Sequence, residues 1–330
     1  MIFVTGGTCF LGKNMIPLLA AQGYRLRALV RRPDEHLWLQ EYGVEVVRGD
    51  LLDAEAIQKG ISGCQYVIHA GGRFRMWGKA EDFWRTNVQG TATVLEAAAR
   101  AGVERLVHVS TIAVVGNPIP GRIVDETHPT CPGDAYQQSK LEGEQVVLRY
   151  LEERGLPAII LRPGAFYGPH GHYAFNRLFF EDPLKGLLIK VAHGNNFTFP
   201  AYIGDVAAAI ASALTLGRVG EIYNISGDPL THNEANNMVS EEAGITPFRF
   251  NAPAGVMLAL ARAWTWLSYL THVEPYYPFN LRLYVFNNWM VSSQKARDEL
   301  NFRPTPFREG VRRTLAWYRQ IGFYRAKQPH

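Results

Sequence analysis

The chain lacks the cysteine pattern of a disulfide-stabilised or zinc-binding protein. Its three cysteines, Cys9, Cys64 and Cys131, are widely spaced, and no two of them form a Cys-x-x-Cys motif. Disulfide frameworks and structural zinc sites normally need paired, closely spaced cysteines. We therefore expect a cytoplasmic location, where thiols stay reduced, and no metal site.

The chain also lacks a strong charge of either sign. Charged residues make up 19% of its 330 residues, and the formal net charge is +4. Most basic residues are scattered, whereas nucleic-acid-binding surfaces concentrate them. The first residues, Ile2-Phe3-Val4, resemble a β-strand more than the basic and apolar parts of a secretory signal. We expect a small-molecule substrate as the partner and no nucleic acid.

Long hydrophobic runs are missing as well. The longest apolar segment, Val256–Leu270, includes Arg262 and falls short of the about 20 residues that a membrane-spanning helix needs. We expect no transmembrane segment. The segment is predicted to be an amphipathic helix packed in the C-terminal part of the chain, and the alternative is a helix at a lipid surface or over a lipophilic substrate.

Short apolar segments alternate with helical patterns through the first half of the chain. This alternation is typical of βαβ units with a parallel sheet. Expected strands cover residues 2–5, 25–30, 44–48, 66–69, 105–109 and 158–161, and expected helices cover residues 11–21, 55–59, 81–101 and 135–154. We predict an α/β fold with a Rossmann-type, doubly wound parallel sheet of six or more strands.

The pattern changes after Arg162-Pro163. Residues 164–200 are rich in glycine, proline, histidine and aromatic residues, and a helix over 205–216 and a strand over 221–225 then resemble a return to the sheet. The remainder is mostly helical. We expect a Rossmann domain formed by residues 1–163 and 201–226, and a smaller, mostly helical substrate-binding lobe formed by residues 164–200 and 227–330.

A glycine-rich turn follows the first strand, in Thr5-Gly6-Gly7-Thr8-Cys9-Phe10-Leu11-Gly12. Gly6 permits a tight turn, Gly12 permits close helix–strand packing, and the following helix presents its N–H groups to a pyrophosphate. Cys9 occupies the place of the usual middle glycine. We expect this turn to bind NAD(P) through Gly6, Thr8, Cys9, Phe10 and Leu11, and the alternative is a degenerate turn that binds no cofactor.

The second strand ends in arginines instead of the acid that binds the ribose of NAD. Arg31 and Arg32 follow Val30, and arginines accommodate the 2′-phosphate of NADP. We predict NADP as the preferred cofactor, with NAD as the alternative. Other candidates for cofactor contacts are Asp50, which is alternatively a helix cap, Leu51, and the small residues Ala70, Gly71 and Gly72.

Tyr136 and Lys140 stand four residues apart in an expected helix, so they share one helix face. A lysine held beside a phenol lowers the phenol's pKa from its usual value of about 10, which makes the tyrosine a usable acid/base. Such a pair is weak by itself, because chance matches are common. Downstream of a dinucleotide turn, it predicts hydride-transfer chemistry.

An ordered set of motifs makes the chain similar to the extended short-chain dehydrogenase/reductase superfamily, also described as the NAD-dependent epimerase/dehydratase superfamily. The motifs are T-G-G-T-x-F-L-G at 5–12, D-L at 50–51, N-V-x-G-T at 87–91, S-T-x-x-V-V-G at 110–116, Y-x-x-S-K at 136–140, R-P-G-x-x-Y-G-P at 162–169 and the S-x-x-K-A-x-x-E-L-x-F-x-P run that ends at Pro304. Within the superfamily, residues 69–77 and 194–206 resemble the dihydroflavonol-reductase and 3β-hydroxysteroid-dehydrogenase-like branch. Val115 departs from the tyrosine usual in sugar-nucleotide epimerases.

This resemblance implies roles for individual residues. Thr111 would hydrogen-bond the reacting oxygen, Tyr136 would donate or accept its proton, and Lys140 would bind the ribose and tune Tyr136; Ser110 is the alternative to Thr111. The resemblance also implies that Asn87 orders the site, alternatively as a purely structural residue, and that Pro163 and Phe166 line the nicotinamide. Proteins that resemble this chain are commonly homodimers.

The C-terminal part is rich in aromatic residues, which favours an apolar or ring-shaped substrate. A sugar diphosphate would instead need arginines at its phosphates, for which Arg177, Arg282 and Arg303 are candidates.

Three hypotheses for the function follow. The first is an NAD(P)-dependent oxidoreductase that interconverts a hydroxyl and a ketone on a lipophilic or ring-shaped molecule, with Tyr136 as acid/base. The second is a sugar-nucleotide epimerase or dehydratase that uses the same Thr111, Tyr136 and Lys140. The third, suggested only by Cys9, is a non-catalytic nucleotide-sensing protein.

Overall fold

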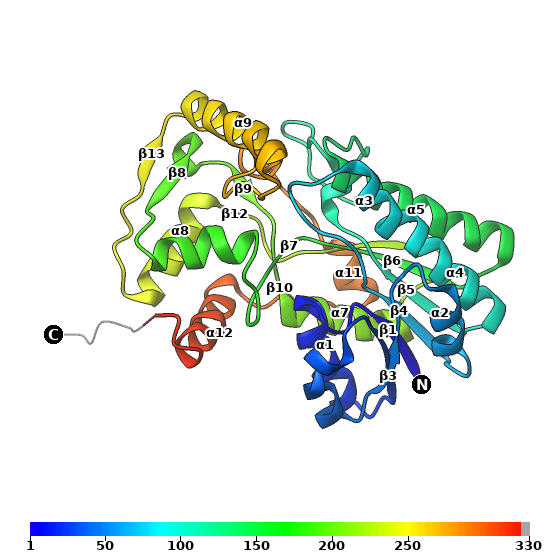
Figure 1. The fold of residues 1–330 in the computed structure, drawn as a ribbon. Coiled ribbons are helices and arrows are strands. Elements are labelled where there is room, and N and C mark those ends of the chain that lie inside the picture. Colours follow the sequence, from blue (N-terminus) through cyan, green and yellow to red (C-terminus); the bar gives the residue numbers. More distant parts are fainter. Residues whose placement is uncertain (325–330) are drawn as a thin grey trace.

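A seven-stranded parallel sheet forms the centre of the computed structural model, which describes residues 1–324 (Figure 1). Its strands are β1 (Ile2–Thr5), β2 (Leu26–Val30), β3 (Glu45–Arg48), β4 (Tyr66–His69), β5 (Arg105–Val109), β6 (Ala158–Pro163) and β11 (Ile222–Ile225). Their order, β11-β6-β5-β4-β1-β2-β3, reverses between β1 and β4, which is where doubly wound sheets bind nucleotides. The predicted α/β, Rossmann-type fold is confirmed.

Helices cover both faces of this sheet. One face packs against α1 (Phe10–Ala21), α7 (Ile203–Thr215) and α11 (Gln294–Glu299), and the other against α2 (Ala54–Ile61), α4 (Gly90–Ala101) and α5 (Ala135–Arg154). Successive side chains of a strand point to opposite faces, so Ile2 and Val4 join the first layer and Phe3 joins the second. Burial on both faces explains why the central strand β1 is continuously apolar up to Thr5, whereas the edge strand β3 is mostly exposed and carries Glu45 and Arg48.

One predicted helix, over residues 81–101, is interrupted. The chain forms α3 (Ala80–Trp84), then a π-helical turn over Arg85–Gln89, then α4. The wider turn buries Asn87, whose amide bonds to groups outside the helix. Apolar periodicity does not reveal such a turn, because the flanking segments keep their helical pattern.

The rest of the chain forms short strand pairs and helices beside the sheet (Figure 1). The strand pairs are β7 (Ala165–Tyr167) with β10 (Pro200–Tyr202), β9 (Phe197–Thr198) with β12 (Leu230–Thr231), and β8 (Ile189–Val191) with β13 (Phe250–Ala252). The helices are α6 (Asp182–Leu184), α8 (His232–Ala243), α9 (Ala254–Thr271), α10 (Arg282–Val285) and α12 (Phe307–Gln320). The division into residues 1–163 with 201–226 and residues 164–200 with 227–330 stays a prediction.

Helix α9 contains the longest apolar segment, and it differs from the packed helix that we expected. Ser268 is its one fully buried residue, while Trp266 is 68% exposed and Leu270 is 63% exposed. Among residues 1–324, no helix combines the length and the apolar character needed to cross a bilayer.

A buried ion pair joins α5 to the sheet. The guanidinium of Arg162 on β6 donates from Nε and Nη2 to the two carboxylate oxygens of Glu144 on α5, at 2.9 and 2.6 Å. Both side chains are almost fully buried. Removing one partner of such a pair leaves an uncompensated charge in a low-dielectric interior, which is strongly destabilising.

We therefore expect Arg162→Met to lower the free energy of unfolding by about 3–5 kcal/mol. The matched control is Arg100→Met, which removes an exposed arginine paired with Glu96 and should cost less than about 1 kcal/mol. Urea denaturation at neutral pH measures both. Equal losses in the two variants would show that the buried pair does not anchor α5.

Candidate active site

The glycine-rich turn between β1 and α1 has the backbone geometry of a dinucleotide site. Gly6 has a φ of +75°, and a Cβ there would lie 2.7 Å from the backbone of Ala70 on the neighbouring β4 loop. A Cβ on Gly12 would lie 2.2 Å from the carbonyl oxygen of Gly7, so only glycine lets α1 start this close to the turn. The first turn of α1 has no acidic residue to compete with a phosphate. These residues fit a bound pyrophosphate.

Cys9 is compatible with this geometry. It is the N-cap of α1 with φ −80° and ψ 179°, an extended conformation that any residue adopts, and it is exposed. Thr8 and Phe10 are partly buried beside it, and the ring of Phe10 packs edge-on against Phe166 at 6.2 Å. Leu11 is buried in the core, so it could contact a cofactor only through its backbone.

Three arginines gather at the carboxyl ends of β2 and β3. Arg31 and Arg32 are exposed, and Arg32 pairs with Glu35 at 2.7 Å, whereas Arg31 has no ion pair among the described residues. Arg48 is the register partner of Val30 on the adjacent strand. The sequence analysis missed Arg48, although the parallel alignment of the second and third strands could have suggested it.

Asp50 and Asp53 have separate local roles after β3. Asp50 accepts a hydrogen bond from the N–H of Leu52 at 2.8 Å and stays exposed. Asp53 is the helix cap and accepts from the N–H of Ala56 at 3.0 Å. Asp50 is therefore not the cap of α2, and its exposed carboxylate is available for the predicted adenine contact.

The loop after β4 lies against β1. The N–H of Gly71 donates to Oγ1 of Thr5 at 3.0 Å, and Oγ1 of Thr5 also bonds to Nδ1 of His69 at 2.8 Å. Burial lowers the pKa of His69 to about 3, so this imidazole is neutral. Ala70 and Gly71 are thereby held next to Gly6, at the switch point of the sheet, and Gly72 lies against the side chain of Asn87.

Thr111, Tyr136 and Lys140 meet beyond the end of β5. Thr111 is extended and begins a short helical turn, with its Oγ1 accepting from the N–H of Ala113 at 3.2 Å. Asp134 caps α5 by accepting from the N–H of Gln137 at 2.8 Å, so the helix starts immediately before Tyr136. Thr111 lies close enough to Tyr136 for its side chain to act on the phenol, and Lys140 follows Tyr136 by one turn of α5.

Lys140 is buried and oriented toward the sheet. Its Nζ donates to the carbonyl oxygen of Val109 at 2.8 Å. Burial lowers the pKa of Lys140 to about 8, and the carboxylate of Glu144, one turn further along α5, opposes this decrease.

The pKa of Tyr136 differs from the expectation. Desolvation raises the pKa of its phenol above the usual value, and the nearby Thr111 side chain only partly opposes the increase. The prediction that Lys140 lowers this pKa is wrong for the protein chain alone, because the ammonium points toward Val109.

Asn87 uses its amide to connect the π-helical turn with the site. Its Oδ1 accepts from the N–H of Arg73 at 2.7 Å, and its Nδ2 donates to the carbonyl of Arg73 at 3.1 Å and to Oγ of Ser139 at 2.9 Å. Ser139 lies between Tyr136 and Lys140 on α5. These bonds fit the structural alternative for Asn87 and place it beside the predicted site.

A cavity opens beside Tyr136. Its lining combines the segment after β4, the start of α5 and the inner side of α9: Arg75, Met76, Trp77, Gly78, Phe83, Asp134, Ala135, Tyr136, Thr265, Tyr269, Phe279 and Asn280. The rings of Phe74 and Phe83 pack against the Tyr136 ring at 4.9 and 6.2 Å. Phe83, Asn280 and Thr265 were missed by the sequence analysis, since no local motif links positions so far apart.

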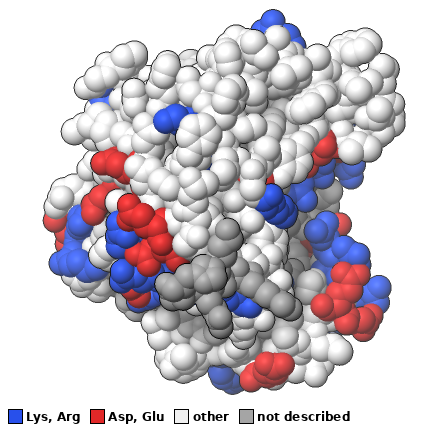
Figure 2. Space-filling view, turned by 90° about the vertical axis from the view of Figure 1, so that its left-hand side faces the viewer, with Lys and Arg blue, Asp and Glu red and all other residues white. Residues whose placement is uncertain are grey.

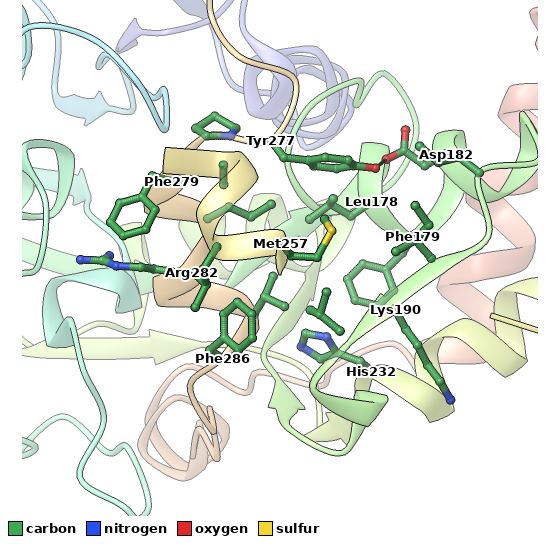
Figure 3. Close-up of a pocket in the computed structure, with 18 of the residues that line it drawn as sticks. Leu178, Phe179, Asp182, Lys190, His232, Met257, Tyr277, Phe279, Arg282 and Phe286 are labelled. Atoms are coloured by element: carbon green, nitrogen blue, oxygen red, sulfur yellow. Dashed lines mark hydrogen bonds between the residues drawn. The ribbon is translucent and has the colours of Figure 1, made fainter. Parts of the chain in front are cut away.

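A second, more apolar cavity lies beside the first, and Phe279 lines both (Figure 3). Its lining is Leu178, Phe179, Asp182, Leu187, Ile189, Lys190, Val191, His232, Asn236, Met257, Leu258, Ala261, Tyr277, Pro278, Phe279, Leu281, Arg282, Val285 and Phe286. Asp182 accepts a hydrogen bond from the Tyr277 hydroxyl at 2.9 Å. Its carboxylate is therefore already bound within the protein.

The family to which the chain belongs follows from comparison with known proteins. The NAD dependent epimerase/dehydratase family matches residues 2–226, and the chain is a member of it. The protein is thus an enzyme of the extended short-chain oxidoreductase class, whose members use NAD(P).

Two curated relatives are reductases or dehydrogenases. The chain is 32% identical to a 4-hydroxy-2-methyl-3-oxo-4-farnesyl-3,4-dihydroquinoline-1-oxide ketoreductase of Stigmatella aurantiaca, over 76% of this chain and 75% of that protein. It is 27% identical to 3beta-hydroxysteroid-dehydrogenase/decarboxylase isoform 1 of Arabidopsis thaliana, over 94% of this chain and 78% of that protein. The resemblance to the 3β-hydroxysteroid-dehydrogenase-like branch is confirmed.

Solved structures share the whole fold. The crystal structure of gox2253 superposes with a TM-score of 0.84 at 31% identity and covers 98% of this chain and 99% of that chain. A dTDP-glucose 4,6-dehydratase from Streptomyces venezuelae, solved as a double mutant with NAD and DAU bound, gives a TM-score of 0.79 at 26% identity, with 98% of each chain covered. The fold therefore serves both ketone reduction and sugar dehydration among relatives.

The buried ammonium of Lys140 predicts a stability effect with a defined pH dependence. Its pKa of about 8 in the folded chain is below the ordinary lysine value of 10.5, so burial of the charge is unfavourable at pH 7. As the pH rises from 8 toward 10.5, the folded state loses this proton first and the penalty disappears. We expect Lys140→Met to be more stable than the parent at pH 7 by about 1–3 kcal/mol, and by less at high pH.

Urea denaturation of both proteins at neutral and alkaline pH measures this difference. The matched control is Lys59→Met, which changes an exposed lysine on α2 and should alter stability little at either pH. A difference between Lys140→Met and the parent that stays constant with pH would contradict the prediction.

Proposed function

We propose that the protein is an NADP-preferring oxidoreductase that interconverts a hydroxyl and a ketone on a lipophilic small molecule. The observation that supports this most directly is the position of the Tyr136 phenol. It lies next to Thr111 at the wall of one cavity, and Phe279 connects that cavity to a second, apolar one. A substrate could place its oxygen at Tyr136 and its apolar part beyond Phe279.

The proposed roles follow from the contacts of each group. The bound nicotinamide supplies or accepts the hydride. Thr111 positions the substrate oxygen, and Tyr136 moves a proton to or from that oxygen. The raised pKa of Tyr136 keeps the phenol protonated near neutral pH, which suits a proton donor to a ketone. The Lys140 ammonium, held by Val109, would bind the ribose, and a cation that approaches the phenol would bring its pKa down.

The proposed cofactor contacts outside this group use the turn and loops described above. We assign Gly6, Thr8, Cys9, Phe10 and Leu11 to the pyrophosphate, Asp50 and Leu51 to the adenine, and Ala70, Gly71, Gly72 and Asn87 to the middle of the cofactor. Pro163, at the end of β6, and Phe166, which packs on Phe10, would line the nicotinamide.

The contacts of the three arginines that could bind a sugar diphosphate support the proposal of a lipophilic substrate. Arg177 donates to the carbonyl of Tyr276 at 2.5 Å, and Arg303 donates to two backbone carbonyls. Arg282 lines the apolar cavity and stacks on Phe279 at 4.5 Å. Of these three arginines, Arg282 alone lines a cavity. The other cations at the two cavities have protein partners, since Arg75 pairs with Glu274 at 3.6 Å and Lys190 donates to Asn233 at 3.2 Å. A sugar diphosphate would favour several free cationic contacts.

A second candidate function is the sugar-nucleotide epimerase or dehydratase, which the Streptomyces venezuelae relative supports. The same Thr111, Tyr136 and Lys140 would then oxidise a sugar hydroxyl, and the cofactor would be regenerated within each turnover. The third hypothesis, a non-catalytic nucleotide sensor, loses its basis because the conformation of Cys9 is compatible with the dinucleotide turn.

Following NADPH absorbance with a panel of apolar ketones tests the proposal. We expect net NADPH consumption, and we expect Tyr136→Phe to lower kcat by about 10²–10⁴-fold because the proton donor is lost. The matched control is Tyr150→Phe on the same helix, whose hydroxyl bonds only to Glu96 and which should keep full activity. Turnover of a nucleotide sugar without net NADPH consumption would support the epimerase or dehydratase instead.

Titration with NADPH and NADH tests the cofactor preference. We expect Arg31→Ala to weaken NADPH binding about 10- to 100-fold and to leave NADH binding unchanged, since only the 2′-phosphate would meet this guanidinium. Arg25→Ala, at the opposite end of β2, is the matched control. Equal affinities for the two cofactors that do not respond to Arg31→Ala would exclude the preference.

A further inference from the structure

The outward face of α9 has an unusual distribution of side chains for a helix at a protein surface. The residues turned toward the protein include Thr265 and Ser268, whereas those turned outward include Trp264, Trp266 and Leu270. Of these, Trp264 is 46% exposed and Trp266 is 68% exposed. Met257, Leu258 and Ala261 also face the protein, so α9 is apolar on both sides, whereas an amphipathic helix at a protein surface keeps its outward side polar.

The apolar surface continues beyond the helix. Pro253 joins α9 directly to β13, where Phe250 is 59% exposed, and Phe248, two residues before this strand, is 66% exposed. The paired strand β8 begins at Ile189, which is exposed as well. We call this surface, made by α9, β13 and β8, the α9 face. Contiguous apolar surfaces of this kind mark interaction sites.

The charge on the α9 face has one sign. Residues 243–273 contain no aspartate or glutamate, and their exposed cation is Arg262, because Arg249 is buried. Residues 183–204 contain Lys185 and Lys190 and again no acid. Figure 2 shows the result: the upper part of the face in view is white with isolated blue groups, while the red groups lie lower down. Such a surface is complementary to an apolar phase that is bordered by negative charge.

The inner side of the same helix lines both cavities. Met257, Leu258 and Ala261 line the apolar cavity, and Figure 3 labels Met257 there. Thr265 and Tyr269 line the cavity beside Tyr136. α9 thus separates the two cavities from the outside along its length. A molecule that covers the outer side of α9 is one helix away from the proposed substrate path.

We propose that the α9 face docks on the surface of an anionic lipid bilayer. Trp264 and Trp266 would lie at the level of the headgroups, where indole rings are favoured, and the exposed leucines would enter the acyl boundary. The exposed Arg262 would face the lipid phosphates. A second copy of the chain fits less well, because a two-fold contact would bring the Arg262 side chains to one patch that holds no acid within residues 243–273.

Flotation with vesicles tests this docking independently of catalysis. We expect the protein to float with vesicles of phosphatidylcholine and phosphatidylglycerol, and to bind less to phosphatidylcholine alone. Trp266→Glu with Leu270→Glu should reduce binding about tenfold or more, because two apolar anchors become acids that the lipid repels. The matched control is Leu37→Glu with Leu216→Glu, which makes the same charge change at exposed leucines away from the α9 face.

Two further measurements make the outcome decisive. Melting temperature and NADPH affinity should be the same in the Trp266/Leu270 variant and the parent, since these side chains are exposed and distant from the turn at Gly6. Failure of the parent to float, or equal flotation of the parent and the variant, would overturn the proposal. A parent that sediments as a dimer, with a monomeric variant and no flotation, would assign the α9 face to a second copy. If the parent floats with anionic vesicles but reduces no ketone, the proposed function is wrong and the docking proposal still holds.

Discussion

The bidentate pair between Arg162 and Glu144 is the interaction on which the geometry of the site depends. It fixes α5 against β6 from within the interior, where a misplaced charge is far more costly than at the surface. Tyr136, Lys140 and Glu144 follow one another at intervals of four residues, so they lie on one helix face. Because Glu144 is held in place, the position of the helix face that carries Tyr136 and Lys140 is fixed as well. The same ion pair keeps the Glu144 carboxylate close to Lys140, where it opposes the decrease in the pKa of Lys140.

Much of the fold could be predicted because its signals are local. The strand over residues 2–5 and the helix over residues 135–154 occur as predicted, since a strand buried on both faces and a long capped helix leave clear patterns in sequence. The turn at Gly6 and Gly12 was predictable for the same reason, because close backbone approach requires glycine at fixed spacing. The predicted order of the strands also places Thr111, at the end of β5, near the start of the helix that carries Tyr136 and Lys140.

The rest of the site could not be predicted, because it depends on contacts between distant segments. Phe83 reaches Tyr136 from a helix broken by a π-helical turn, which apolar periodicity does not register. Phe279 and Asn280 arrive from a segment more than a hundred residues further along the chain. The direction of the Tyr136 pKa shift was also beyond the sequence, since spacing places Lys140 on the same face but does not say that its Nζ bonds to Val109.

Helix α9 lies between the cavity beside Tyr136 and the outer surface of the protein. Folding alone would favour the apolar side of this helix against the core, and the observed arrangement leaves Trp266 and Leu270 in contact with solvent. Its polar inner residue Thr265 instead lines the cavity beside Tyr136. The helix thus borders two different environments, the cavity beside Tyr136 on its inner side and, in the docking that we propose, a lipid surface on its outer side. A lipophilic ketone would have to pass between those two environments, and α9 is the element that touches both.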